Sequence, residues 1–532
     1  MNGKRPIIAS LHGVVAAAHP MAAQAGIRML HEGGNAFDAA VATAAAIGVV
    51  EPFMSGLFGN GMATVRAKGQ PIRSLQFRAG VPKNFPLGRY STREDMHRGP
   101  MATTGPGNLA GWAELLRSHG SKSLAEVLAP AIKLAREGFV LISYNAYGCN
   151  SSAKDLAKYP FFEEWSRVHT GGVGSVQEGQ VLRQPELADT LEAIAGHGIG
   201  HLYGGKLGQR IVDFLAESGG CLSMADIEDA QHTPWIAPAV ARYRDLEVHV
   251  PPPPSQGFQF LLGLRILDGF RLSGMAHNGV EHLDTVWRAV RLAAGARINA
   301  GNPSPDALAE LLSDASVAAL RERCADGMPV QGPTEQWLAP KGEKLRGQHT
   351  TSISAADKDG NIVCLTHSLG AMYGNGMIVP GTGVCLNNGL YWGELDPRSP
   401  NHLIPGGALM SSVSPSLSTR NGVPVLTLGT PGSYGIAQTQ TQALVHHIDF
   451  GLGLQDAIEA PRARLWDGRR VQAENRINAN VLDALQARGH EVEAPAAWTV
   501  AVGGMQGISI VPETGAMIGG ADPRREGYAI GA

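Results

Sequence analysis

The sequence predicts a layered protein built from α-helices and β-sheets, of the α/β or α+β class. Apolar spacing typical of helices dominates the chain before residue 350, and strand and turn patterns dominate the chain after it. Strands are nevertheless expected in both parts, and this combination favours a layered fold. The 68 glycines and 33 prolines are scattered along the chain, so they indicate many short elements with tight connections.

The part of the chain before residue 350 is expected to be mainly helical. A first helix at residues 20–30 should end at Gly33-Gly34, and the alanine-rich helix that runs to Val50 should be buried on most of its sides. Further helices are expected at residues 109–119, 124–137, 184–196, 207–218, 258–272, 281–298 and 306–323, and strands at residues 62–65, 72–77 and 246–250.

The part of the chain after residue 350 is expected to be rich in strands. They are predicted at residues 384–388, 411–418, 423–428, 502–511 and 517–520, with helices at 438–445, 454–460 and 481–488. A glycine turn at 431–435 should open the first of these helices. Residues 333–347 are polar and aperiodic, so they are the most linker-like segment of the chain, and they lie directly before Thr350.

Residues 348–368, QHTTSISAADKDGNIVCLTHS, read as a strand, a tight turn and a second strand. Asp359-Gly360-Asn361 supplies a residue that tolerates positive φ where a hairpin must reverse. Because Thr350 would open the first strand, it could become a chain terminus without disturbing the sheet. We hypothesise that the chain cuts itself before Thr350, whose hydroxyl would then be the nucleophile and whose free α-amine would be the base.

This stretch alone also has a purely structural interpretation. A Thr-Thr pair that opens a strand and an Asp-Gly turn are explained by β-propensity and turn chemistry without any catalysis. Evidence from the rest of the sequence is therefore needed to distinguish a catalytic Thr350 from a purely structural one.

The composition restricts the binding partners and the cellular compartment that we expect for this protein. The net charge of −3 and the sequence pI near 6.7 argue against a nucleic acid or an anionic membrane as partner. The five cysteines are odd in number and lack metal-like spacing, which fits a reducing compartment without a disulfide framework.

Residues 1–25 faintly resemble a signal peptide, with Lys4-Arg5 before an apolar stretch. His12, His19 and Pro20 break that stretch, and no segment reaches the roughly 20 uncharged apolar residues of a membrane span. We therefore expect a cytoplasmic protein rather than a periplasmic one, with no membrane partner.

Five motifs occur in a fixed order over most of the chain. They are GVVAAAHPMAAQAGIRMLHEGGNAFDAAVA from Gly13, PPPPSQG from Pro251, TTSISAADKDGN from Thr350, MSSVSPSL from Met410 and GGADPRREGYAIG from Gly519. With them the chain resembles the γ-glutamyltransferase family of N-terminal-nucleophile hydrolases. The resemblance implies an αββα sandwich of the α+β class. It also implies a precursor that cleaves itself into a large subunit (1–349) and a small catalytic subunit (350–532), which together form one structural domain.

The resemblance also assigns catalytic residues. Thr350 aligns with the family nucleophile, because it lies seven residues before Asp357; Thr351 is the adjacent candidate. Ser368 falls where the family keeps a second hydroxyl beside the nucleophile. Gly432-Ser433 falls at the Gly-Gly oxyanion site, where two backbone N–H groups would face the developing oxyanion.

The substrate-binding residues are assigned in the same way. Arg78 matches the arginine that grips the substrate carboxylate, and Ser411-Ser412 matches a serine pair that holds the same carboxylate. Each also has a structural interpretation: Arg78 as a surface arginine at a strand end, and the serines as residues that pair within the sheet. No metal ligand set is recognised, because the adjacent His446 and His447 of a helix point in different directions. No cofactor is expected.

The chain departs from the family where γ-glutamyl enzymes recognise the α-amino group of the substrate. The aligned positions hold Gly370, Gly389 and Trp392, and none of these side chains accepts a hydrogen bond from an ammonium group. Glu394 or Asp396 could replace the missing acceptor, although the alignment does not support it. In this respect the chain resembles divergent members such as oxamate amidohydrolases.

The expected function is hydrolysis of, or transfer from, γ-glutamyl-type amides through an acyl-enzyme on Thr350. One alternative is another small carboxylate-bearing amide such as oxamate. A second is an uncleaved homologue that binds without catalysis. The expected partners are therefore this small-molecule amide and the two subunits of the same precursor, and a homo-oligomer of the cleaved heterodimer is left open.

Overall fold

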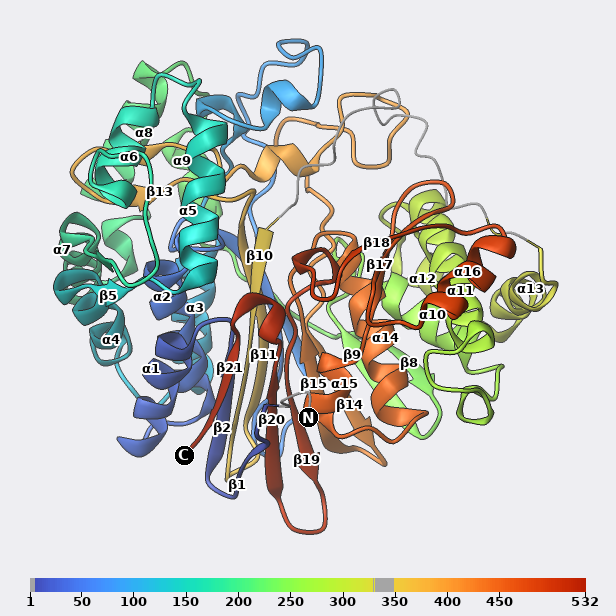
Figure 1. Ribbon diagram of the computed structural model, residues 1–532. Helices are drawn as coiled ribbons and strands as arrows, with labels where there is room; N and C mark the ends of the chain where they lie inside the picture. The colour runs from blue at the N-terminus through green and yellow to red at the C-terminus, as the bar shows by residue number, and fades with distance from the viewer. Residues whose placement is uncertain (1–4, 329, 331–348) are drawn as a thin grey trace.

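The computed structural model describes residues 5–328, 330 and 349–532 and arranges them in four layers. Two seven-stranded β-sheets stack face to face, and helices cover the outer face of each sheet (Figure 1). The predicted αββα arrangement is confirmed. The linker-like segment at 333–347 lies outside the described residues.

The first sheet is centred on the hairpin predicted to hold the nucleophile. Strands β10 (His349–Asp357) and β11 (Ile362–Gly370) pair antiparallel, and all their residues except His349 are buried. The order of the sheet is β21-β2-β10-β11-β3-β4-β7. Its other strands are β2 (Gly13–Ala17), β3 (Asn60–Arg66), β4 (Arg73–Phe77), β7 (Trp235–Ile236) and β21 (Tyr528–Gly531). Strands from both sides of residue 350 therefore alternate within one sheet.

The second sheet packs against the first and has the order β1-β20-β19-β15-β14-β9-β8. Its strands are β1 (Ile8–Ser10), β8 (Ala239–Tyr243), β9 (Leu246–Val250), β14 (Ser416–Arg420), β15 (Val423–Gly429), β19 (Gln506–Val511) and β20 (Ala516–Ala521). Strand β15 ends at Gly429, where an added Cβ would lie 1.9 Å from Ser352 Oγ of β10. The two sheets thus approach each other closely two residues from Thr350.

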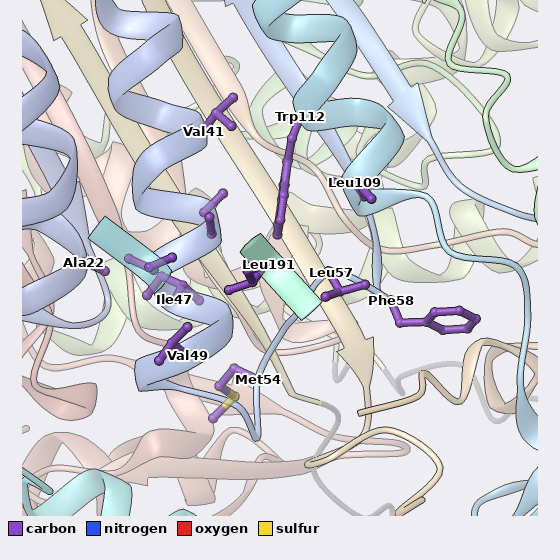
Figure 2. Close-up of a cluster of buried hydrophobic side chains, with 14 of the residues drawn as sticks. Ala22, Val41, Ile47, Val49, Met54, Leu57, Phe58, Leu109, Trp112 and Leu191 are labelled. Atoms are coloured by element: carbon purple, nitrogen blue, oxygen red, sulfur yellow. The ribbon is translucent and has the colours of Figure 1, made fainter. Parts of the chain in front are cut away.

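The first helical layer covers the sheet that contains β10. Helix α2 (Ala36–Val50) lies directly on β10 and is buried on almost every side, as its alanine content predicts. Figure 2 shows the core that α2 forms with Trp112 and Leu191 of neighbouring helices. The layer also contains α1 (Pro20–His31), α3 (Asn108–His119), α4 (Leu124–Glu137), α5 (Ser143–Leu156), α6 (Phe162–Thr170), α7 (Pro185–His197), α8 (Lys206–Glu217) and α9 (Met224–Asp229).

The second helical layer covers the other sheet and has its own hydrophobic core. It consists of α10 (Phe258–Leu267), α11 (Val280–Ala300), α12 (Pro305–Leu311), α13 (Asp314–Ala325), α14 (Gly435–Ile448), α15 (Leu454–Glu459) and α16 (Ala479–Ala487). Small sheets are formed by β5 (Phe139–Val140) with β6 (Val181–Leu182), by β12 (Ile378–Val379) with β13 (Val384–Cys385), and by β16 (Ala463–Leu465), β17 (Arg470–Glu474) and β18 (Glu491–Ala496).

Several predicted boundaries were wrong. The helix expected at 306–323 is two helices, because Ser313 caps the second one through its side chain. The helix expected at 258–272 ends at Leu267, and the strand expected at 384–388 has only two residues. Ser411 and Ser412 precede strand β14 instead of lying in it; Ser411 forms only an isolated bridge with Ser255.

None of the helices in the described residues is long and apolar enough to span a bilayer.

Candidate active site

Thr350 lies in an irregular part of the central hairpin. His349 pairs with Gly370 and Thr351 pairs with His367, so the register shifts between these pairs, and Thr350 lies opposite a bulge that has its extra residue on β11. Bulges re-aim side chains and are frequent beside active sites. Thr350 is 1% exposed, and its Oγ1 donates a hydrogen bond to Ser368 Oγ at 3.1 Å.

Ser368 connects the predicted nucleophile to the peptide bond that precedes it. Its hydroxyl accepts from Thr350 Oγ1 and from the backbone N–H of Gly370 at 2.8 Å, and it donates to the carbonyl oxygen of His349. The His349–Thr350 bond is the bond predicted to break. One hydroxyl therefore contacts both the attacking oxygen and the carbonyl that it would attack.

A pocket brings three of the predicted residues together, namely Arg78, Ser368 and Ser411. Arg78 follows strand β4 directly. The residue as a whole is half-buried, but its Nη1 is covered and has no hydrogen-bond acceptor among the described residues. Burial lowers the pKa of the Arg78 guanidinium to about 10, with nearby Tyr434 opposing the shift. A covered guanidinium without an acceptor suits a carboxylate ligand.

The two predicted serines differ in position. Ser411 lines the pocket, and its Oγ accepts from the backbone N–H of Val413 at 3.2 Å. Ser412 does not line the pocket. Its buried Oγ has no hydrogen-bond partner in the part of the chain that the structure describes.

The predicted oxyanion turn, Gly432-Ser433, lies between strand β15 and helix α14. Gly432 has φ +131° and Ser433 has φ +56°, so the turn uses positive φ at two successive residues. The Gly432 carbonyl accepts from Arg464 Nη1 at 2.6 Å, which fixes the turn. Neither residue lines the pocket with Arg78, but β15 brings the turn to the region where Gly429 packs against Ser352.

The three positions where the chain departs from γ-glutamyl enzymes all lie in the wall of this pocket. Gly370, Gly389 and Trp392 line it, and no carboxylate is among the lining residues that the structure describes. Glu394 pairs with Arg93 at 3.3 Å and lines a different pocket. Asp396 pairs with Arg398, whose hydrogen bond lowers the pKa of that carboxyl to about 2. The described lining therefore offers the covered Arg78 guanidinium to an anionic group and no carboxylate to balance an ammonium group.

Sequence reasoning missed part of the wall. Asn387, which is not among the predicted site residues, accepts from Thr104 and Gly389 backbone N–H groups through its Oδ1 and donates to the Phe58 carbonyl. Asn60 joins the wall by accepting from the backbone N–H of Ala79 at 2.8 Å. Both side-chain amides hold backbone segments in place. In the sequence, only their position close to glycine residues could have indicated this role.

Glu51 is another buried residue that the sequence did not single out. It caps the C-terminal end of α2 and is 1% exposed, and its Oε2 lies 3.5 Å from Thr351 Oγ1. Burial raises the pKa of this carboxyl to about 8, although Arg525 opposes the shift. A protonated carboxyl therefore lies behind the strand that carries Thr350.

The adjacent histidines of α14 do point apart, as expected. His446 Nδ1 contacts His277 Nε2 at 2.9 Å, whereas His447 Nδ1 faces the Leu452 carbonyl at 2.7 Å.

Two stacked sheets between helical layers, with a threonine hydroxyl at the start of a central strand, define the fold of the N-terminal-nucleophile hydrolases. The chain matches the gamma-glutamyltranspeptidase family over residues 22–532 and belongs to this family. It is therefore an enzyme of the class that includes hydrolases and acylases.

Individual relatives match nearly the whole chain. It is 32% identical to an acylase ACY 1 proenzyme of Pseudomonas sp. (strain V22), covering 99% of this chain and 94% of the relative. It is 31% identical to the glutathione hydrolase proenzyme of Bacillus subtilis (98% and 91% covered) and 28% identical to the oxamate amidohydrolase proenzyme of Klebsiella pneumoniae (98% and 99% covered). The crystal structure of cephalosporin acylase from Bacillus halodurans superposes with a TM-score of 0.88 at 29% identity, covering 100% of this chain and 98% of that one.

Proposed function

We propose that this chain is a self-cleaving amidohydrolase in which Thr350 is the nucleophile, and that the cut gives a large subunit (1–349) and a small subunit (350–532). The observation that carries the proposal is the Ser368 hydroxyl, which accepts from Thr350 Oγ1 and donates to the carbonyl of His349. The proenzyme names of the relatives support a self-processing precursor.

The proposed cut is an N-to-O acyl shift. Thr350 Oγ1 attacks the carbonyl carbon of His349, the C–N bond breaks, and the hydroxyl proton ends on the departing nitrogen. Ser368 stabilises the oxyanion that develops on the His349 carbonyl. Water then hydrolyses the ester, which leaves a carboxylate on His349 and a free α-amine on Thr350.

The same threonine would then act on an external amide. Its α-amine, with an ordinary pKa near ~8, takes the hydroxyl proton as Oγ1 attacks the substrate carbonyl. The N–H groups of Gly432 and Ser433 hold the oxyanion, the protonated amine leaves, and water releases the acyl group from the ester.

The pocket favours a substrate whose acyl part carries a carboxylate. Arg78 would bind this carboxylate with Ser411 and Ser412, which fixes the amide over Thr350. Because Gly370, Gly389 and Trp392 offer no acceptor for an ammonium group, an α-amine is not required. Glutaryl amides and oxamate fit this description, and a γ-glutamyl amide is tolerated without being preferred. The range of names among the relatives supports this breadth.

A substrate panel with one common leaving group tests the proposal. We expect glutaryl anilide to be hydrolysed at least as well as γ-glutamyl anilide, and butyryl anilide, which lacks the carboxylate, to be hydrolysed at least ~100-fold less well. Arg78→Ala should raise KM for both anionic substrates. Arg73→Ala, at the exposed start of the same strand, is the control and should leave KM unchanged. Equal turnover of butyryl anilide would contradict the proposed role of Arg78.

A further inference from the structure

A buried arginine lies against the turn that the proposed reaction uses for the oxyanion. Arg464 belongs to strand β16 and is 8% exposed, and its Nη1 donates to the carbonyl of Gly432 at 2.6 Å. The reaction steps proposed above do not involve this side chain.

The guanidinium lies in the curve of the turn, where helix α14 begins. A Cβ added at Gly435, the first residue of α14, would lie 1.6 Å from Arg464 Nη1, and one added at Gly432 would lie 3.6 Å from the same atom. Glycine at position 435 therefore leaves the room that the guanidinium occupies. Its Cζ also lies over the Trp466 ring, 4.6 Å from the centroid, so the group is held on more than one side.

Arg464 adds a positive charge to a helix end that is already positive. Burial lowers the pKa of this guanidinium to about 10, with Arg525 adding to the shift and Asp467 opposing it, so the group stays charged at neutral pH. Its covered Nε has no hydrogen-bond acceptor in the described part of the chain. Because the N-terminal end of a helix stabilises negative charge, the helix and the guanidinium together favour a negative charge that develops beside the turn.

The contact with Gly432 also sets the direction of one peptide group. The C=O and N–H of a trans peptide point in opposite directions, so a Gly432 carbonyl held at Arg464 turns the following N–H the other way. Gly432 has φ +131°, a conformation in which glycine is far less restricted than other residues. Without the guanidinium, this peptide could flip and present its carbonyl oxygen where the proposed reaction needs a donor.

We propose that Arg464 is a positioning residue for amide hydrolysis. Its guanidinium holds the peptide group that follows Gly432 in the orientation that the substrate oxyanion requires, and polarises it as the negative charge develops. This inference rests on the proposed function, in which the turn at 432–433 stabilises that oxyanion. Self-cleavage relies instead on Ser368, which donates to the carbonyl of His349. The two reactions of Thr350 should therefore differ in their dependence on Arg464.

Arg464→Met removes the charge and the donor while keeping a long side chain. We expect its precursor to cut itself within about threefold of the wild-type rate, because Ser368 is intact. The cleaved variant should hydrolyse glutaryl anilide with a kcat at least ~30-fold lower and a KM within about twofold of wild type. Arg464→Lys, which keeps a charged donor, should recover part of kcat.

Arg321→Met is the matched control. The Arg321 guanidinium also donates to a backbone carbonyl, that of Arg265 at 2.7 Å, and its Cδ would lie 2.8 Å from a Cβ added at Gly269, but it belongs to helix α13. This variant should keep the wild-type kcat.

A tetrahedral inhibitor separates the transition state from the ground state. In 4-boronobutyrate, boron replaces the scissile carbonyl carbon of the glutaryl group; Thr350 Oγ1 forms a B–O bond, its proton passes to the α-amine, and the adduct is a tetrahedral anion. Glutarate provides only the carboxylate contacts. Arg464→Met should weaken binding of the boronate at least ~30-fold and that of glutarate by no more than about twofold.

An unchanged kcat in Arg464→Met would overturn the inference. So would an equal loss in self-cleavage and hydrolysis, or an equal weakening of the two inhibitors, because either result would indicate a purely structural role. A wild-type protein that remains uncut, or that hydrolyses no anionic anilide, would instead contradict the proposed function.

Discussion

At the scale of single residues, the account depends on the hydroxyl of Ser368. It contacts both Thr350 Oγ1 and the carbonyl of His349. Ser368→Ala removes a donor to the developing oxyanion, a loss that typically costs ~3 kcal/mol, so self-cleavage should slow by roughly 100-fold. Gel electrophoresis of freshly synthesised protein over time measures this rate.

Ser368→Thr keeps the hydroxyl and serves as the control for that variant. We expect it to be cleaved within about tenfold of the wild-type rate. Cleavage of Ser368→Ala at the wild-type rate would remove this hydroxyl from the mechanism.

Glu51 gives a prediction about pH. The carboxyl has a pKa of about 8 in the folded protein and about 4.5 when exposed. Between these values the folded state holds a proton that the unfolded state has lost, so stability decreases as pH rises from about 4.5 to 8 and is constant above that. Gln mimics the protonated form at all pH values, so Glu51→Gln should be more stable than wild type by a margin that grows to roughly a few kcal/mol at pH 8.

Melting temperatures at pH 5 and pH 8 test this prediction. Glu217→Gln, at the exposed end of α8, is the control. Its melting temperature should differ from that of the wild type by the same small amount at both pH values. A Glu51→Gln variant whose stability relative to wild type does not change with pH would show that Glu51 is ionised in the fold.

The sequence predicted only part of the site. Thr350, Ser368, Arg78 and Ser411 could be placed because each lies in a recognisable motif, and the structure brings them to one region. Residues that act through backbone contacts, such as Asn387, could not, because their partners are hundreds of positions away. The same holds for Glu51, whose burial depends on how α2 packs on β10.

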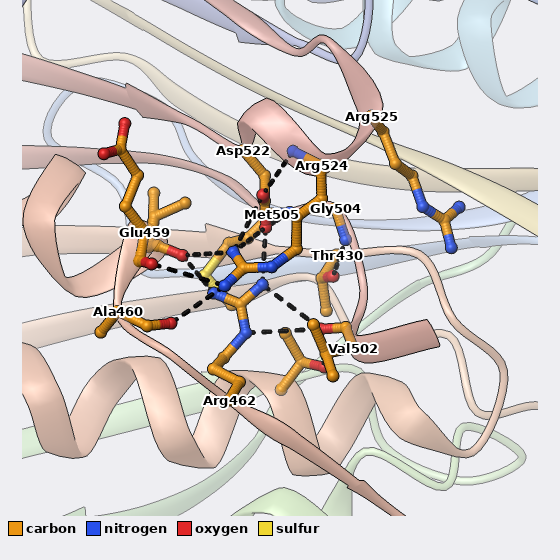
Figure 3. Close-up of polar contacts among 12 residues, drawn as sticks. Thr430, Glu459, Ala460, Arg462, Val502, Gly504, Met505, Asp522, Arg524 and Arg525 are labelled. Atoms are coloured by element: carbon orange, nitrogen blue, oxygen red, sulfur yellow. Dashed lines mark hydrogen bonds and ion pairs between the residues drawn. The ribbon is translucent and has the colours of Figure 1, made fainter. Parts of the chain in front are cut away.

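At the scale of elements, the C-terminal motif ADPRR forms a buried cluster of charges that joins α15, β17 and the end of β20. Asp522 pairs with Arg462 at 2.6 Å and with Arg524 at 3.1 Å (Figure 3). Arg524 also pairs with Glu474 at 2.7 Å. Although burial opposes it, the two arginines hold the pKa of Asp522 at about 2. The cluster therefore adds buried ion pairs to the apolar contacts between these elements.

Asp522→Asn should destabilise the protein strongly. Both arginines would lose a charged partner while remaining buried, which typically costs 3–5 kcal/mol. Denaturant unfolding measures the loss, with the exposed Asp483→Asn on α16 as the control. A change below ~1 kcal/mol would show that the cluster contributes little net stability.

The elements that could be predicted are those with strong local signals. Residues 124–137 were predicted with correct bounds because Ser123 and Glu126 form a capping box and Gly138 ends the helix. Helices α5 and α6 were not predicted, because their many polar residues interrupt the helical spacing of the apolar ones. Both helices are held in place by contacts with distant residues such as Tyr373. The strand expected at 411–418 begins only at Ser416, because the residues before it belong to the pocket wall.

At the scale of the whole molecule, the two proposed subunits are interleaved. Strand β2, from residues before the cut, lies between β21 and β10, and the second sheet likewise has strands β1, β8 and β9 beside strands from after residue 350. A single cut before Thr350 breaks none of these pairings. We therefore expect the two fragments to elute together in native gel filtration and to separate only in denaturant.

Two fragments of about 37 and 19 kDa are expected from the total of 55.9 kDa. Their separation under native conditions would contradict the interleaved arrangement, since each seven-stranded sheet takes strands from both fragments.

The most direct test is the amino-terminal sequence of the small fragment. The account predicts that it begins with Thr-Thr-Ser-Ile at Thr350 and that Thr350→Ala yields a single chain without activity. A fragment that begins at any other residue, or a wild-type protein that is active yet remains one uncut chain, would contradict it.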